Sequence, residues 1–198
     1  MIKYPNGKEI AAKGKTDSAP KKRVLLSAKN RGMKLEDDIN VTNEYYRDNK
    51  LCLITKRPTP INIVRVDYSK GAKIVDAYFE KQSTTDYNGV YKGKYIDFEA
   101  KSTESKTSFP IANITSHQLK HLENVLFHGG IAFFIIEFTR LDEETYLLDA
   151  KYILDFIKEG KRKSIPLDDV RKFGHKIKRG YMPRLDYLPV MEEVYFSK

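Results

Sequence analysis

The chain has 198 residues, enough for one domain with a hydrophobic core, and its 40% hydrophobic and 32% charged residues are typical of a soluble globular protein. No apolar run reaches the ~18 residues of a membrane span, and no apolar signal segment follows the first residues. We therefore expect a cytoplasmic protein without a membrane partner. The single cysteine, Cys52, excludes a disulfide framework and a cysteine-based zinc cluster, and its apolar neighbours predict a buried, inert thiol.

The net charge of +9 is concentrated in two segments. Residues 1–31 contain nine Lys or Arg against two Asp or Glu, and residues 158–184 contain ten against three. Such segments favour a polyanionic partner, because the release of counterions from nucleic acid contributes to binding. The alternative is a solubilising tail and a solvated loop, and charge alone leaves both interpretations open.

The first 29 residues contain few large apolar side chains, and Gly, Pro, Ser and Lys recur among them. This composition predicts a disordered basic arm over residues 1–29, because it cannot bury enough apolar surface to fold. The remaining residues, 30–198, are expected to form a single domain.

Two patterns open this domain. Residues 30–49 have helical periodicity, and residues 51–55 predict a short strand that ends at the prolines beyond it. The apolar side chains that fall near one face of the helix are Leu35, Ile39 and Tyr46.

An insertion over residues 57–81 has the pattern of a β-hairpin. Residues 61–68 and 72–79 are β-rich, and the residues between them, 69–71, form a turn signal. We expect the basic side chains of this hairpin to be exposed and to contact nucleic acid. They are Arg65, Lys70, Lys73 and Lys81.

The most regular strand pattern lies at 95–101, after a glycine-containing turn. Apolar and polar side chains alternate strictly there, so they fall on opposite faces of a strand. Ile96, Phe98 and Ala100 share one face, whereas Asp97, Glu99 and Lys101 share the other.

The second half of the domain continues with a helix that should start after an N-cap at Thr115 and end at the glycine pair 129–130. Residues 131–138 are an apolar run suited to a buried central strand. The remaining predictions are a strand at 145–148, a short helix at 152–158 and a basic, loop-rich region at 159–184.

One constellation carries a specific chemistry: Asp86, followed by Glu99 and Lys101. Residues i and i+2 of a strand point the same way, so Glu99 and Lys101 project together, and a turn can return their strand to Asp86. Carboxylates are hard ligands for Mg²⁺, and a nearby lysine can position the attacking water and stabilise the transition state of phosphodiester hydrolysis. The alternative is a surface strand with ordinary alternating charges, since Asp followed later by Glu-X-Lys is common by chance.

The order of elements around this constellation favours the nuclease interpretation. A helix and a strand precede it, and a capped helix and a buried strand follow it. The core of restriction-endonuclease-like nucleases requires this order, with a central mixed β-sheet flanked by helices. We therefore predict an α/β fold of that class, with a protruding β-hairpin.

Four motifs also resemble those of the RecU family of Holliday junction resolvases, and the likeness extends from about residue 30 to the C-terminus. They are 31–40 (RGMKLEDDIN), 84–89 (TTDYNG), 97–101 (DFEAK) and 117–119 (HQL). In this family the hairpin at 57–81 corresponds to a protruding stalk. The resemblance implies a homodimer that cuts four-way DNA junctions symmetrically. The stalks would enter the centre of the junction, and the basic segments would hold its arms.

The resemblance further implies a set of site residues. Metal would be held by Thr85, Asp86, Glu99 and Gln118, and Lys101 would stabilise the transition state. Mg²⁺ is the expected cofactor, with Mn²⁺ as a substitute. Thr85 would contribute either its backbone carbonyl or its hydroxyl. In the wider nuclease class the residue before the Asp is Pro, so Thr85 departs from that class and agrees with the narrower family.

Three further side chains, outside these motif roles, are candidates for a catalytic or metal-binding role. Helices in this fold class often supply one more carboxylate to the cleft, so Glu36 on the first helix is a catalytic candidate, with a solvated helix charge as the alternative. His117 and His121 are four residues apart on a predicted helix, a spacing able to bind zinc. No third ligand accompanies them, so we do not expect a zinc site.

These observations predict a Mg²⁺-dependent endonuclease that resolves four-way DNA junctions in recombination and repair, leaving a 5′-phosphate. It would act in the cytoplasm at the nucleoid, with a recombinase and branch-migration proteins as further candidate partners. Two alternatives remain. One is another restriction-like nuclease, specific for a DNA structure or a mismatch, and the other is a non-catalytic DNA-binding protein whose acidic cleft is incidental.

Overall fold

The computed structural model of the chain describes residues 28–79 and 84–197. Most of the predicted arm, residues 1–27, and Lys81 of the hairpin lie outside the described residues. Within the described ranges, no helix combines the length and apolar character needed to cross a membrane.

In chain order the elements are α1 (Ala28–Asp48), β1 (Leu53–Lys56), β2 (Ile61–Asp67), β3 (Lys73–Phe79), β4 (Tyr87–Tyr91), β5 (Lys94–Thr103), β6 (Ser108–Pro110), η1 (Ile111–Asn113), α2 (Ser116–Phe127), β7 (Ile131–Phe138), β8 (Glu144–Asp149), α3 (Ala150–Glu159), β9 (Ser164–Pro166), α4 (Leu167–Phe173), β10 (His175–Lys176), β11 (Lys178–Arg179), β12 (Leu185–Asp186) and α5 (Leu188–Tyr195).

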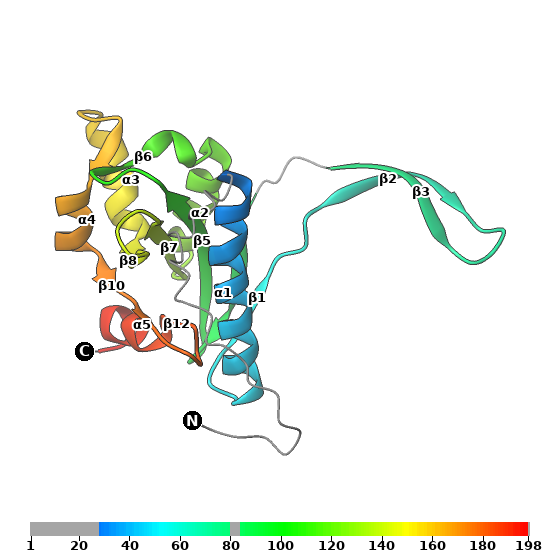
Figure 1. Cartoon of the computed structure of the whole chain (residues 1–198), viewed down its shortest axis with the longest axis horizontal. Helices are drawn as coiled ribbons and strands as arrows, with labels where there is room; N and C mark the ends of the chain where they lie inside the picture. Colours follow the sequence, from blue (N-terminus) through cyan, green and yellow to red (C-terminus); the bar gives the residue numbers. More distant parts are fainter. Residues whose placement is uncertain (1–27, 80–83, 198) are drawn as a thin grey trace, which may run out of the picture.

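A six-stranded mixed sheet forms the centre of the domain, in the order β1–β4–β5–β7–β8–β10 (Figure 1). β5 and β7 are parallel and are connected through α2, whereas the other neighbouring strands are antiparallel. The elements α1, β1, β4, β5, α2 and β7 follow one another in the predicted order. The predicted α/β class, with a central mixed sheet flanked by helices, is confirmed.

The two faces of the sheet pack against different helices. On one face, Leu35, Ile39 and Tyr46 of α1 join the buried residues of α5 in one core cluster, which confirms the predicted apolar face of α1. On the other face, α2, α3 and α4 contribute a second cluster. β7 lies between the two clusters, so all eight of its residues are buried, as its apolar run predicted.

Stacked aromatic rings hold the central strands in register. Tyr87 of β4 stacks on Phe98 of β5 with 4.8 Å between ring centroids, and Phe98 stacks on Phe133 of β7 at 4.7 Å. Asp86 directly precedes Tyr87, the first residue of β4, and Glu99 directly follows Phe98. Because Tyr87 and Phe98 are cross-strand partners, Asp86 lies close to Glu99. The strand alternation then directs Glu99 to the face opposite these rings.

The β1 edge of the sheet is held closely against β4. A Cβ atom at Gly89 would lie 2.0 Å from the backbone oxygen of Leu53, so only glycine fits this approach. Gly93, with φ of +76°, makes the turn that folds β5 back along β4. Cys52, just before β1, is buried as predicted, and burial raises the pKa of its thiol to about 11, which makes it unreactive.

The strands β2 and β3 form the predicted hairpin and project from the body of the domain (Figure 1). Their register runs from the pair Ile61 and Phe79 to the pair Asp67 and Lys73. Nearly all of their side chains are exposed. The hairpin therefore adds little to the core of the domain, and its two roots connect it to the rest of the fold.

The region after α3 is more regular than predicted. Residues 159–184 were expected to be loop-rich, but they contain α4 and the sixth strand of the sheet, β10, and α5 was not predicted. These elements have seven, two and eight residues, too few for a period to be recognised in the sequence. These short elements are stabilised by the tertiary packing of buried side chains such as Val170 and Met191.

Candidate active site

Three elements bring predicted site residues together around Glu99 on β5. The backbone N–H of Asp86, directly before β4, donates to Glu99 Oε2 at 3.1 Å. Lys101, two residues along the same strand, has its Nζ 2.7 Å from Glu99 Oε1. Gln118, in the first turn of α2, donates through Nε2 to the same oxygen at 2.5 Å. Four of the residues that the sequence singled out for nuclease chemistry therefore form one contiguous group.

The environment of Glu99 disfavours its negative charge. The residue is 1% exposed, and its pKa is raised to about 8, by burial first and by the charge of Asp86 second. Lys101 acts in the opposite direction but only partly offsets these two effects. A cation bound between Glu99 and Asp86 would offset both the cost of burying the negative charge of Glu99 and its repulsion by Asp86.

The ligand atoms in this group suit Mg²⁺. In the described ranges, no three His, Cys, Asp or Glu side chains gather into a metal-binding group. Mg²⁺ does not require such a group, because it is commonly held by one or two carboxylates together with water and substrate phosphates. Asp86 and Glu99 supply two carboxylates around a buried and incompletely neutralised charge, so the residues present fit this ion.

The side chain of Thr85 makes a contact outside this carboxylate group. Thr85 is fully buried, and its hydroxyl donates to Asp97. The sequence left two atoms of Thr85 open as metal ligands, the carbonyl and the hydroxyl. Since the hydroxyl has another partner, the backbone carbonyl is the better candidate.

The N-terminus of α2 fixes the orientation of Gln118. Thr115 is the N-cap, as predicted: its hydroxyl accepts from the Gln118 N–H at 3.3 Å, and Gln118 Oε1 accepts from the Thr115 N–H at 3.0 Å. The amide oxygen therefore faces Thr115, and the amide nitrogen faces Glu99. In this arrangement Gln118 orients Glu99, and its oxygen would reach a metal ion only after the amide rotates.

Glu36 on α1 contacts Tyr87, the residue that follows Asp86. Its carboxylate is ion-paired with Lys56 of β1. The hydroxyl of Tyr87 donates to the backbone carbonyl of Glu36 at 3.3 Å. The pKa of Tyr87 is raised by burial first, and then by the charges of Glu36 and Asp86. The charges of Glu36 and Asp86 thus both act on the Tyr87 hydroxyl, but the partner of the Glu36 carboxylate is a lysine.

A second buried carboxylate, Asp97, belongs to the same region and was not singled out as a site residue. It is fully buried, accepts from Arg57 Nη2 at 2.5 Å and lies 2.9 Å from His121 Nε2. His121 therefore contacts a carboxylate on the neighbouring strand. The alternation of β5 placed Asp97 on the same face as Glu99, but nothing in the sequence identified its partners.

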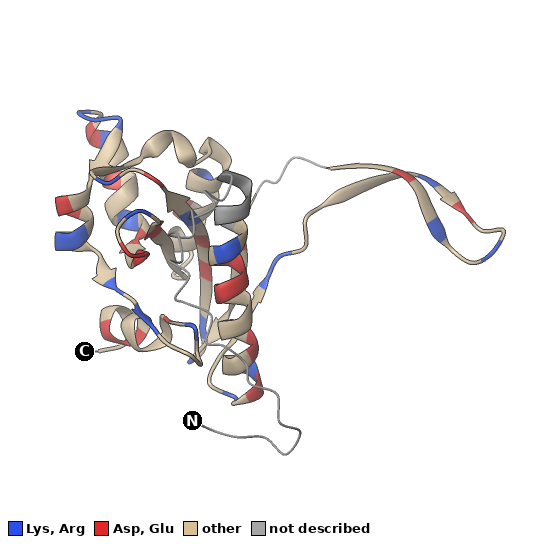
Figure 2. Cartoon of the chain, viewed as in Figure 1, with Lys and Arg blue, Asp and Glu red and all other residues tan. Residues whose placement is uncertain are grey.

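Arg65, Lys70 and Lys73 are exposed on the hairpin, as predicted. Figure 2 marks Lys and Arg positions in blue along the hairpin and at its tip. Lys81, the fourth predicted contact, lies outside the described residues. The acidic residues Asp67 and Asp76 lie on the same hairpin. Its exposed surface is therefore mixed in charge, and the three cations described are all accessible to a polyanion.

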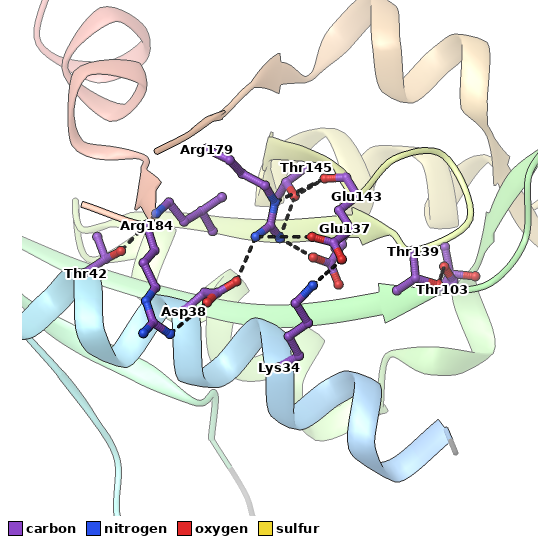
Figure 3. A network of polar contacts seen from close by, with 11 residues as sticks. Lys34, Asp38, Thr42, Thr103, Glu137, Thr139, Glu143, Thr145, Arg179 and Arg184 are labelled. Carbon is purple, nitrogen blue, oxygen red and sulfur yellow. Dashed lines mark hydrogen bonds and ion pairs between the residues drawn. The ribbon is translucent and has the colours of Figure 1, made fainter. Parts of the chain in front are cut away.

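The basic segment 158–184 is less available to DNA than its charge implied. Arg179 is ion-paired with Glu137 and, at 2.7 Å, with Asp38, and Arg184 lies 3.3 Å from Asp38 (Figure 3). These pairs attach the segment to α1 and β7. Part of its positive charge is therefore neutralised within the protein, which charge counting did not detect.

An α/β core of this strand order, with two carboxylates and a lysine gathered on its central strands, defines the class of restriction-endonuclease-like nucleases. The RecU family, described as Recombination protein U, matches residues 30–193. The match covers most of the chain, and the chain belongs to this family.

Similar proteins are known over the whole length of the chain. The Holliday junction resolvase RecU of Geobacillus kaustophilus (strain HTA426) is 52% identical, covering 100% of this chain and 99% of the relative. The protein of the same name from Bacillus cereus (strain AH820) is 50% identical and covers 99% of each chain. A solved structure of Archaeoglobus fulgidus Hjc, described as a Holliday junction resolvase from an archaeal hyperthermophile, is 12% identical, with a TM-score of 0.43 over 73% of this chain and 94% of that chain.

Proposed function

We propose that this chain is a Mg²⁺-dependent endonuclease, with Mn²⁺ as a substitute ion, that resolves four-way DNA junctions by symmetric cleavage in recombination and repair. The observation that carries the proposal is that Asp86 and Lys101 both contact the buried carboxylate of Glu99, and that Lys101 only partly offsets the burial and repulsion of its charge. The names of the full-length relatives support the substrate class. A protein of this activity would work in the cytoplasm at the nucleoid.

The roles follow from the contacts of each residue. Asp86, Glu99 and the backbone carbonyl of Thr85 would hold the ion, and Gln118 would keep Glu99 in place through its amide nitrogen. When bound, Mg²⁺ supplies Lewis acidity at the phosphate and lowers the pKa of the attacking water. The ammonium of Lys101 lies 2.7 Å from Glu99, one of the proposed metal ligands. From this position it would stabilise the negative charge that develops on the phosphate.

The reaction is hydrolysis of one phosphodiester bond in each of two strands. The water oxygen forms a bond to phosphorus, and the bond between phosphorus and O3′ breaks, which leaves a 5′-phosphate and a 3′-hydroxyl. Glu36 remains a candidate for an additional catalytic carboxylate, because its backbone contacts Tyr87, the residue next to Asp86. Its pairing with Lys56 would have to open for that role.

Symmetric cleavage requires two sites, so we propose a homodimer. A four-way junction has two equivalent scissile strands, which a two-fold axis relates as it relates two protomers. Leu53, Val90 and Tyr95 are cross-strand partners on one face of β1, β4 and β5, and they are 49%, 45% and 41% exposed. These three side chains are uncharged and largely apolar, which favours a protein surface over DNA as their partner, and a second copy of the chain is the partner that the symmetry requires.

The remaining parts of the chain would bind the junction. The hairpin of residues 57–81 would enter its open centre with Arg65, Lys70, Lys73 and Lys81, while the arm of residues 1–29 and the unpaired cations of residues 158–184 would contact phosphates. The nuclease domain would comprise residues 30–198. A recombinase and branch-migration proteins, which form and move such junctions, are candidate partners.

The experiment is cleavage of a labelled synthetic four-way junction with Mg²⁺ or Mn²⁺, beside linear duplex and mismatched duplex of the same sequence. We expect paired, symmetric cuts in the junction and none in the presence of chelator. Preferential cutting of duplex or mismatch would identify another nuclease of the same class. Binding without metal-dependent cutting would identify a non-catalytic DNA-binding protein.

A further inference from the structure

The buried carboxylate Asp97 is the centre of a polar cluster beside the site, and four side chains contact it. Its Oδ1 accepts from the hydroxyl of Thr85. Its Oδ2 accepts from Arg57 Nη2 at 2.5 Å and from the Tyr95 hydroxyl at 2.9 Å, and lies 2.9 Å from His121 Nε2. None of these four residues was assigned to the cluster from the sequence, and only Thr85 has a role in the proposed reaction.

The partners of Asp97 come from each element that carries a proposed metal-site residue. Thr85 directly precedes Asp86, and Asp97 itself lies two residues before Glu99 on β5. His121 is one turn along α2 from Gln118. Asp97 therefore joins the three pieces of chain whose relative position defines the site.

The same cluster also contains both roots of the projecting hairpin. Arg57 directly follows β1, where the chain leaves the body towards β2, and Thr85 lies where the chain returns before β4. The backbone N–H of Arg57 donates to the Asp86 carbonyl at 2.7 Å, so the entering root contacts the returning root as well as Asp97. Figure 1 shows the hairpin extending away from the body beyond these roots. The entering root of the hairpin is therefore hydrogen-bonded to the segment that carries Asp86.

We propose that Asp97 is a positioning residue that ties both roots of the β2–β3 hairpin to the elements carrying the metal ligands, so that engagement of the hairpin by DNA is passed to Asp86 and Glu99. The physical basis is that a buried carboxylate accepts charge-assisted hydrogen bonds in few geometries, and its partners must move together or lose them. The inference rests on the proposed nuclease function.

The test uses a pair of matched variants. Thr85→Val removes the hydroxyl that donates to Asp97 and keeps the Thr85 backbone carbonyl. Thr145→Val is the control, because Thr145 is also buried and its hydroxyl also donates one hydrogen bond, to the backbone carbonyl of Glu143 at 2.8 Å, outside the proposed site. Asp97→Asn tests the carboxylate directly, and Thr85→Val keeps the inference testable if that variant does not fold.

We expect Thr85→Val to lower kcat on the junction by about 10- to 100-fold, the range typical of residues that orient metal ligands, while junction affinity in chelator stays within about twofold. Thr145→Val should cleave at the wild-type rate. Without metal or DNA, the amide protons of Arg57 and Asp86 should exchange faster in Thr85→Val than in Thr145→Val, because the Arg57 amide joins the two roots and the Asp86 amide joins the returning root to Glu99. Equal cleavage and equal exchange in the two variants would overturn the positioning role.

The coupling to the hairpin is tested by a double-mutant cycle. Replacing residues 66–75 by Asn-Gly keeps the pair Arg65 and Asp76 as the last of a shortened hairpin. If DNA engagement is passed through the Asp97 cluster, this replacement and Thr85→Val should together lower kcat no more than the larger single effect. Effects that multiply, or a shortened hairpin with wild-type kcat, would overturn the coupling. A wild-type protein that does not cleave junctions would instead refute the proposed function.

Discussion

Glu137 lies on β7 with 1% of its surface exposed and is paired with Arg179 (Figure 3). Its pKa is raised to about 7, because the loss of hydration on burial outweighs the attraction of Arg179. Each tenfold difference in proton affinity between the folded and unfolded chain is worth ~1.4 kcal/mol. The rise from the usual 4.5 to about 7 therefore makes about 3 kcal/mol of stability dependent on pH.

Folding makes Glu137 bind its proton more tightly, so the group stabilises the fold below its unfolded pKa and loses that contribution as the pH rises through about 7. Glu137→Gln removes this titration and keeps the shape of the side chain. We expect the free energy of unfolding of the variant, relative to wild type, to increase by roughly 2 to 3 kcal/mol between pH 5 and pH 8. Junction cleavage should be unchanged, because Glu137 makes no contact in the proposed site.

Urea unfolding followed by circular dichroism at several pH values would measure this difference. Glu144→Gln is the control, because the hydrogen bond from Arg171 lowers the pKa of Glu144. The stability contributed by a lowered carboxylate pKa is present above the unfolded pKa and is lost only at more acidic pH, so this variant should differ from wild type by nearly the same amount at pH 5 and pH 8. If Glu137→Gln also differed by a constant amount, the ion pair with Arg179 would fully compensate the burial of Glu137, and the reasoning would be refuted.

Four further predictions concern the proposed function. Asp86→Asn and Glu99→Gln should each lower junction cleavage by more than about a hundredfold but leave binding in chelator intact, because they remove metal ligands and not phosphate contacts; cleavage assays beside gel shifts check this. Lys101→Ala should lower turnover by about a hundredfold and still bind Mg²⁺ in a calorimetric titration, since its charge acts on the transition state. Deleting residues 1–29 should weaken DNA binding and reduce its salt dependence without unfolding the domain, which binding at several salt concentrations would measure. Replacing residues 66–75 by Asn-Gly should reduce the preference for junction over duplex in competition gel shifts; a folded variant that keeps its full preference would exclude the hairpin as the recognition element.

The sequence predicted structure best where a local pattern and the tertiary fold impose the same requirement. The alternation at 95–101 became β5, with apolar rings on one face and acidic side chains on the other. Thr115 became an N-cap with a full capping box, and the apolar run 131–138 became the fully buried β7. In each case the order of side chains along a short stretch of sequence is enough to identify the strand or the helix N-cap.

Prediction was poorer where contacts distant in sequence decide the outcome. Arg179 counted as an available cation in a basic segment, yet its partner Asp38 lies 141 positions earlier in the chain. α4 and α5 are too short to show a helical period, and buried side chains hold them. Charge counts and periodicity carry no information on which distant residues meet, so both the ion pairs and the short helices were missed.

For the same reason, the sequence could not distinguish the roles of the two acidic residues of β5. Asp97 and Glu99 share a face and a chemistry, so the sequence alone could not assign them different roles. In the fold, Asp97 accepts from Arg57, a guanidinium 40 positions earlier, whose charge compensates its burial. Glu99 faces Asp86 instead, and with only Lys101 to offset that charge its pKa still rises to about 8. A buried carboxylate that already has a fixed cation needs no metal ion, whereas one beside a second carboxylate does, which favours Glu99 as the ligand and Asp97 as its support.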